Sequence, residues 1–173
     1  VKGCKVDLIM RDTQVDPKVG VDAAKALVDL EKVPVLIGAV SSGVSMPILT
    51  SVSVPSKVMQ ISCCSSSTVF TDLAKDGKTK GLWFRTFTTT RNHAAVAAKI
   101  IHGKGYQNIA IFYKNDDWGQ DVGRLVQEDL EALGITVTAS IAINDGQPSY
   151  RAEVVEALKS NPEAIYLALY PKE

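Results

Sequence analysis

The sequence is poor in several features that would point to particular classes of protein. Its 173 residues include only 3 cysteines and 2 histidines, and 6% of them are aromatic. The longest strongly apolar stretch, residues 33–40, is far shorter than the roughly 20 residues that a membrane-spanning helix requires. Lys plus Arg and Asp plus Glu number 19 each, so the formal net charge is zero. Without a basic surface, the chain is not expected to bind nucleic acid or anionic lipid.

The cysteines do not suggest a disulfide framework, because an odd number cannot pair completely within the chain. Cys63 and Cys64 are adjacent, and a bond between neighbours strains the intervening peptide, so they are not expected to bond to each other. Either one remains a candidate partner for Cys4. His93 and His102 lie at no metal-ligand spacing from a cysteine, so no metal and no cofactor is expected.

Hydrophobic patterning instead predicts alternating strands and helices. Asp16 and Pro17 predict the start of a helix, and apolar residues recur every three or four positions from 19 to 30. Further helices are expected over residues 44–52, 92–102, 120–133 and 149–158. Strands are expected over residues 4–10, 33–37, 57–61, 82–86, 108–113, 135–143 and 164–169. Residues 72–81 are charged and rich in glycine, which predicts a mobile surface connection.

This alternation predicts an α/β fold with mostly parallel sheets. Two blocks of elements, residues 1–87 and residues 88–173, predict two Rossmann-like lobes. Each block has few strands for a closed sheet, so we expect the chain to be an internal piece of a longer polypeptide, or its sheet edges to be completed by another chain. Domain swapping or dimerisation through those edges is one such arrangement.

In open parallel sheets, ligands bind beyond the carboxyl ends of the strands, where helix N-termini present free N–H groups. Two serine-rich loops in the first block suit a carboxylate, and aromatic and acidic loops in the second suit an aliphatic or ring-shaped body and an ammonium group. Each feature alone also fits helix capping or packing. The loops are residues 40–43, 62–68, 115–119 and 170–171.

Catalytic motifs are absent: the sequence has no G-x-S-x-G elbow, no P-loop and no G-x-G-x-x-G. A thiol–imidazole pair of Cys63 or Cys64 with His93 is an alternative, but packed thiols and a surface histidine account for the same residues. We therefore expect a binding protein and not an enzyme.

Five segments carry a resemblance to a known family. They are residues 7–17 (DLIMRDTQVDP), 35–43 (VLIGAVSSG), 83–86 (WFRT), 109–120 (IAIFYKNDDWGQ) and 170–171 (YP). Along essentially the whole chain, the sequence resembles the type I periplasmic binding proteins, and within them the branched-chain amino-acid receptors of ABC transporters. The resemblance implies two Rossmann-like lobes joined by three crossing strands, of which this chain holds an incomplete part.

The same resemblance implies which residues bind the ligand. Ser42 matches a serine that donates to the ligand carboxylate. Ser65 and Ser66 match the next loop, which holds the carboxylate and ammonium, although Cys63 and Cys64 stand where the family commonly has Pro-Gly. Trp118 takes the place of a family tyrosine that covers the ligand, and Tyr170 matches an aromatic residue near the ligand side chain.

The implied function is capture of an amino acid or a related carboxylate or amide for an ABC importer, with a membrane permease as partner. The implied location is periplasmic, or extracellular and membrane-anchored. No signal peptide opens the chain, so an export signal is expected to lie outside it. A ligand-sensing receptor or regulator of the same fold is the alternative, and a fragment that binds nothing is a third.

Overall fold

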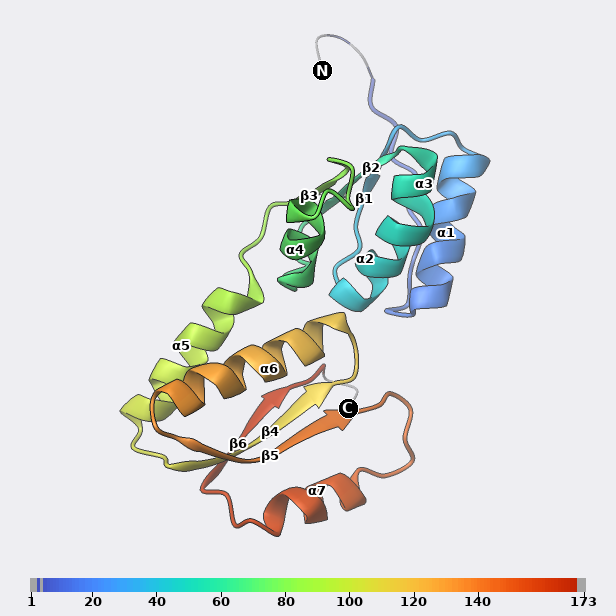
Figure 1. The fold of residues 1–173 in the computed structure, drawn as a ribbon. Helices are drawn as coiled ribbons and strands as arrows, with labels where there is room; N and C mark the ends of the chain where they lie inside the picture. The colour runs from blue at the N-terminus through green and yellow to red at the C-terminus, as the bar shows by residue number, and fades with distance from the viewer. Residues whose placement is uncertain (1–2, 4, 171–173) are drawn as a thin grey trace. The chain divides into compact units, whose positions relative to one another are not determined.

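The structure is a computed structural model that describes residue 3 and residues 5–170. It is an α/β protein with two separate three-stranded parallel sheets, as predicted (Figure 1). Contacts divide the chain into two compact units. Unit 1 comprises residues 1–65 and 73–86, and unit 2 comprises residues 66–72 and 87–173.

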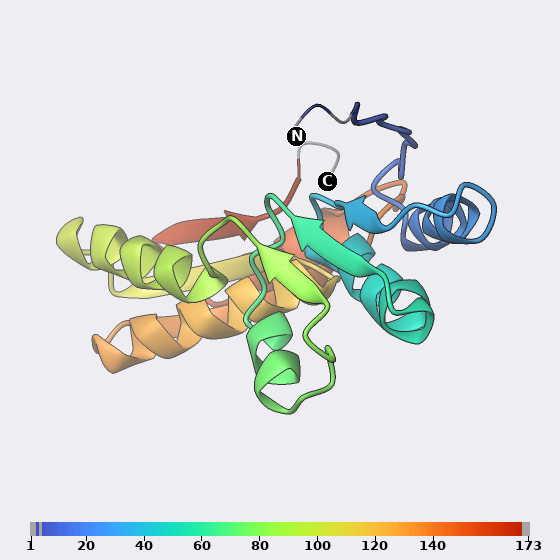
Figure 2. The same cartoon turned by 90° about the horizontal axis from the view of Figure 1, so that it is seen from above.

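Unit 1 is built on a sheet with strand order β1-β2-β3 (Figure 2). Its core joins α1 to α2 and β1 through buried small and branched side chains, among them Val28, Leu36 and Val44. In chain order its elements are α1 (Pro17–Asp29), β1 (Val35–Ile37), α2 (Ser42–Ile48), the π-helical segment η1 (Leu49–Ser53), α3 (Val54–Ser56), β2 (Met59–Ser62) and β3 (Trp83–Arg85); α4 (Val69–Lys75) spans the boundary between the units.

The start of α1 follows from its sequence. The Asp16 side chain accepts a hydrogen bond from the Val19 amide at 2.8 Å, and Pro17 fills the first turn. A proline costs nothing there, since its missing N–H would have no partner inside the helix. The predicted helix is confirmed. The next helix begins at Ser42 and continues through η1 and α3 to Ser56, beyond the predicted end at residue 52.

Unit 2 is a sheet with strand order β5-β4-β6, covered on both faces. Helices α5 and α6 lie on one face and α7 on the other (Figure 1). Successive residues of the central strand point to opposite faces, so Ile109 and Ile111 pack with α5 and α6, whereas Ala110 and Phe112 pack with α7. Its elements are α5 (Thr90–Gly103), β4 (Asn108–Lys114), α6 (Asp117–Ala132), β5 (Thr136–Ile143), α7 (Arg151–Leu158) and β6 (Ala164–Ala168).

Two predictions about local structure are wrong. Residues 5–10 form no strand: they have no hydrogen-bonded neighbour strand, and Leu8 and Met10 are exposed. The predicted connection over residues 72–81 begins with helix, because α4 extends to Lys75. Phe70, which is fully buried, and the Thr68 carbonyl, which accepts the Thr71 amide at 2.8 Å, hold the start of that helix.

The cysteine prediction is also wrong in one respect, since a disulfide joins Cys63 to Cys64. The chain bends sharply after β2, where the amides of Cys64 and Ser65 both donate to the Ser62 hydroxyl, at 3.2 and 2.9 Å. This turn brings the consecutive side chains together. Cys4, the other candidate partner, lies outside the described residues.

The junction between β4 and α6 requires a residue without a side chain at position 119. Gly119 is buried, and a Cβ there would overlap the backbone carbonyl and amide of Lys114. A backbone neighbour cannot turn aside as a flexible side chain can. Glycine at this position therefore allows the first turn of α6 to begin directly after the strand.

Gly119→Ala should lower the free energy of unfolding by about 3 kcal/mol, the upper end of the usual cost of overpacking. Gly103→Ala is the matched control. Gly103 is the last residue of α5, and a Cβ at this position would enter open space, so alanine should raise stability there by up to about 1 kcal/mol. Denaturant unfolding of both variants measures the difference, and equal stabilities would contradict the close approach at Gly119.

Candidate ligand-binding site

The unit 1 part of the candidate site is a group of hydroxyls at the carboxyl ends of β1 and β2. The Ala39 amide donates to Ser45 Oγ at 2.8 Å, and the Ser62 hydroxyl donates to the Ala39 carbonyl at 2.6 Å. The Ser65 hydroxyl donates to Ser45 Oγ at 2.8 Å. These bonds tie the loop after β1 to the loop after β2, and we call Ser45, Ser62 and Ser65 the serine lattice.

A buried glutamine of β2, Gln60, supports the loops that carry the serine lattice. Gln60 is fully buried in β2, and its amide nitrogen donates to the carbonyls of Gly38 and Ser45 at 3.1 and 3.2 Å. Its amide oxygen accepts the Ser53 hydroxyl at 2.9 Å. Since a buried amide left without partners is costly, these bonds fix the position of the first-unit loops.

The two predicted serines of unit 1 differ in surroundings. Ser42 is the first residue of α2 and is buried. Ser65 is fully buried, and its hydroxyl and amide both bond within the serine lattice. Ser41, beside Ser42, is 5% exposed, and its hydroxyl has no hydrogen-bond partner among the described residues. Ser41 lies in the serine-rich loop 40–43 that the sequence predicts to face the ligand, although only Ser42 of this loop was named as a ligand-binding residue.

The unit 2 part of the candidate site lies where β4, β5 and β6 end. The Trp118 and Tyr170 rings stack with their centroids 5.0 Å apart and an interplanar angle of 6°. Lys114 Nζ lies 5.5 Å from the centroid of the Tyr170 ring and forms an ion pair with Asp145. The structure thus brings together two predicted residues that are far apart in sequence, with Lys114 and Asp145 as neighbours that sequence reasoning missed.

Asp116 positions Trp118 by capping α6. Its carboxylate accepts the Trp118 and Gly119 amides at 3.0 and 2.8 Å. Burial raises the pKa of Asp116 above its usual value, and these hydrogen bonds and the charge of Lys114 oppose that rise only in part. Burial, followed by the charge of Asp116, also raises the pKa of neighbouring Asp117.

Ser66 groups with unit 2. It is 2% exposed, and its carbonyl accepts the Thr90 amide at 2.8 Å. Convergence of Ser42, Ser65, Ser66, Trp118 and Tyr170 on one ligand stays a prediction; Pro171, which completes the last predicted loop, lies outside the described residues.

Among the described residues, no group of three His, Cys, Asp or Glu side chains is placed to hold a metal ion.

Comparison with known proteins identifies the family. The model of the family described as periplasmic binding protein matches residues 1–173, and the chain belongs to this family. Its members are solute-binding proteins without enzymatic activity, which agrees with the expectation drawn from the sequence.

Two relatives match nearly the whole chain. One is a substrate-binding protein of a chemotactic signal transduction system, BasB, from Halobacterium salinarum, which is 26% identical over 95% of this chain and 40% of its own length. The other is an amino acid binding protein from Pseudomonas aeruginosa, 23% identical over 99% of this chain and 45% of its own. The chain therefore spans less than half the length of these relatives.

Solved structures share the fold. The leucine binding protein LivK from Thermotoga maritima superimposes with a TM-score of 0.83 at 23% identity, over 95% of this chain and 45% of that one. An ABC-transporter solute binding protein from R. palustris in complex with 4-hydroxybenzoate gives 0.83 at 20% identity, over 98% and 44%. In the part of the chain that the structure describes, no helix combines the length and apolarity needed to cross a bilayer.

Asp116→Ala should lower the free energy of unfolding by about 1 kcal/mol, because the amides of Trp118 and Gly119 lose their side-chain acceptor. Asp116→Asn is the matched control, since asparagine keeps an oxygen in the same place. Urea unfolding at neutral pH measures both variants. An alanine variant as stable as the asparagine variant would contradict the capping role.

The difference in stability between Asp116→Asn and the wild type should depend on pH, because the pKa of Asp116 is raised in the folded protein. A carboxyl group whose folded-state pKa is raised contributes stability below its unfolded pKa, near 3.8, and that contribution is lost as pH rises through the folded pKa. Asparagine does not titrate. As pH rises from about 3.8 through the folded-state pKa, the stability of Asp116→Asn relative to the wild type should therefore increase. Urea unfolding at a series of pH values measures this change.

Proposed function

We propose that this chain is part of an extracytoplasmic solute-binding protein of an ABC importer. In this proposal, residues 1–87 and 88–173 belong to two lobes that bind an amino acid or a similar small carboxylate or amide between them. The observation that carries it is the family match over residues 1–173. Similarity to solute binding proteins of ABC transporters supports it.

The chemistry of unit 1 suits a carboxylate. Ser41 and Ser42 lie where a helix begins after a parallel strand, a position that favours anions because backbone N–H groups and the helix dipole point there. The serine lattice and Gln60 hold these loops in place before a ligand arrives. A preorganised donor loses little freedom on binding, which favours affinity.

The chemistry of unit 2 suits the remainder of such a ligand. The stacked rings of Trp118 and Tyr170 present flat apolar surface, and aromatic faces also attract cations. The side chains of Asp116, Asp117 and Asp145 add carboxylates at the same edge of the sheet. An ammonium group or an aromatic ring would each find a favourable contact there.

Binding would proceed by closure of the two lobes around the solute. Rotation about the chain segments that join them would remove the ligand from water and create the surface that a membrane permease recognises. No bond is made or broken in this cycle. Pairing of two copies through open strand edges stays a prediction.

A sensory role is the second candidate, and one specific observation favours it. The relative from Halobacterium salinarum is named as a substrate-binding protein of a chemotactic system. Both roles require the same binding step. Uptake of labelled ligand by cells with and without the gene, measured beside their chemotaxis toward it, distinguishes them.

The binding step is tested by calorimetry of the full-length protein with a panel of amino acids, aromatic acids and amides. L-leucine and 4-hydroxybenzoate belong in it, because similar proteins bind leucine or were solved with 4-hydroxybenzoate. At least one compound should bind. Failure of the whole panel would contradict the proposal.

Ser42→Ala should weaken binding of a carboxylate ligand by about 1–3 kcal/mol, the worth of a hydrogen bond to a charged group. Ser51→Ala is the matched control, because Ser51 lies in the adjoining segment η1 and is exposed. Calorimetry with whichever compound binds the wild type measures both. Unchanged affinity in Ser42→Ala would remove this residue from the proposed site.

A further inference from the structure

A short segment between two strands of unit 1 belongs to unit 2. Residues 66–72 follow β2 and precede β3, yet they group with residues 87–173. The chain therefore passes between the units three times: between residues 65 and 66, 72 and 73, and 86 and 87. Ser65 and Ser66, both predicted to contact ligand, lie on opposite sides of the first passage.

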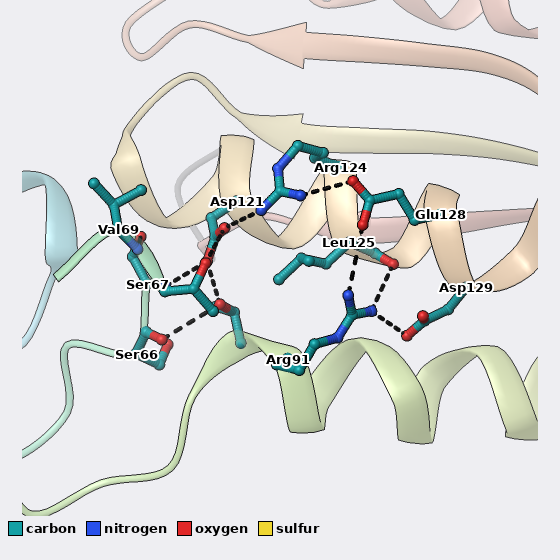
Figure 3. Close-up of polar contacts among 11 residues, drawn as sticks. Ser66, Ser67, Val69, Arg91, Asp121, Arg124, Leu125, Glu128 and Asp129 are labelled. Atoms are coloured by element: carbon teal, nitrogen blue, oxygen red, sulfur yellow. Dashed lines mark hydrogen bonds and ion pairs between the residues drawn. The ribbon is translucent and has the colours of Figure 1, made fainter. Parts of the chain in front are cut away.

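The carboxylate of Asp121 bonds this segment to unit 2. Asp121, on α6, accepts the amide and the hydroxyl of Thr68, each at 2.7 Å. Its oxygens also accept the hydroxyl of Thr90, at the start of α5, and Arg124 Nη2 at 2.9 Å. Figure 3 shows Asp121 at the centre of these contacts, between the Ser66–Val69 segment and Arg124. Both oxygens of the carboxylate are thus used.

The Asp121 side chain is 2% exposed, so it depends on these donors. Burial favours the neutral acid, but the hydrogen bonds from Thr90, Thr68 and Arg124 outweigh it and hold the pKa of Asp121 below its usual value. The group is ionised at neutral pH. Hydrogen bonds to a charged group are stronger than those between neutral groups.

Thr90 connects Asp121 to Ser66 through hydrogen bonds. While its hydroxyl donates to Asp121, its backbone amide donates to the Ser66 carbonyl at 2.8 Å. On the other side of the passage, the Ser65 hydroxyl is held by Ser45 in unit 1. Ser65 is therefore held by the serine lattice, and Ser66 by the Asp121 network through Thr90.

The packing of α5 on α6 does not itself require Asp121. Further along α6, Glu128 and Asp129 form ion pairs with Arg91 of α5 (Figure 3). Arg91 also donates to the Leu125 carbonyl at 3.2 Å. These contacts join the same two helices. What Asp121 adds is the connection to residues 66–68.

We propose that Asp121 is a positioning residue for the ligand loop, which acts through Thr68 and Thr90 to set the geometry of Ser66. This proposal rests on the proposed function, because it assigns Ser66 to the ligand site. Loss of the carboxylate charge would let residues 66–72 move and would weaken ligand binding.

The experiment compares Asp121→Asn with Asp129→Asn in the full-length protein. The two substitutions are chemically identical and lie on the same helix, but Asp129 pairs with Arg91 and not with residues 66–72. Thr90→Val is the second variant, since it removes one donor to Asp121 and the 3.3 Å contact of the same hydroxyl with the Ser66 carbonyl, but keeps the backbone amide that bonds to that carbonyl at 2.8 Å. Each protein is measured by amide hydrogen exchange without ligand, by thermal unfolding, and by calorimetry with a panel compound that binds the wild type.

In Asp121→Asn, the amides of residues 66–72 should exchange about tenfold faster, and affinity should fall about tenfold. Thr90→Val should show the same changes to a smaller extent. Asp129→Asn should leave both within about twofold of the wild type, even if its melting temperature falls. A structural role alone would lower the melting temperature and leave the affinity unchanged.

Unchanged exchange in Asp121→Asn would overturn the proposed anchor. Faster exchange with unchanged affinity would overturn the positioning role. If no panel compound binds the wild type, the proposed function fails, and the exchange measurement still decides whether Asp121 fixes residues 66–72.

Discussion

Both units depend on one constraint: polar groups buried where parallel strands end are satisfied mainly by partners inside the protein, although the Ser41 hydroxyl has none among the described residues. In unit 1, the Gln60 side chain bonds to the Ser53 hydroxyl and to two backbone carbonyls, and the hydroxyls of the serine lattice bond to one another and to the backbone. In unit 2, the carboxylate of Asp121 satisfies two threonines and an arginine. Because an unsatisfied buried group costs more than a satisfied one contributes, these bonds favour one arrangement of each loop.

Sequence reasoning predicted elements that their own residues determine. The capped and amphipathic α1, and the apolar β4, follow from local pattern alone. Residues 5–10 have a strand-like pattern but no neighbour strand, and pairing is a property of the whole sheet. The start of α4 was missed because the buried Phe70, which holds that helix, comes just before the charged residues 72–81, and these residues indicated a surface loop.

For the site, the rule that ligands bind at the carboxyl ends of strands selected candidate loops but could not predict the contacts within them. It selected Trp118 and Tyr170, which stack. It did not reveal that the hydroxyl of Ser65 is used inside the protein or that Lys114 and Asp145 pair, because such bonds depend on side-chain positions across several strands. The same reason explains why Asp121 had no visible signal: its two threonine partners are 31 and 53 positions away.

The membership of residues 66–72 in unit 2 bears on how such proteins can be recombined. A chimaera made by joining two relatives at a single point near residue 87 would take this segment from one parent and α6 from the other. Asp121 would then face the loop of the other parent. If that parent has no hydroxyl residue at position 68, the buried carboxylate of Asp121 would lose one of its hydrogen-bond donors. Successful exchange of a lobe therefore requires two additional crossover points, before residue 66 and after residue 72, so that residues 66–72 and unit 2 come from the same parent.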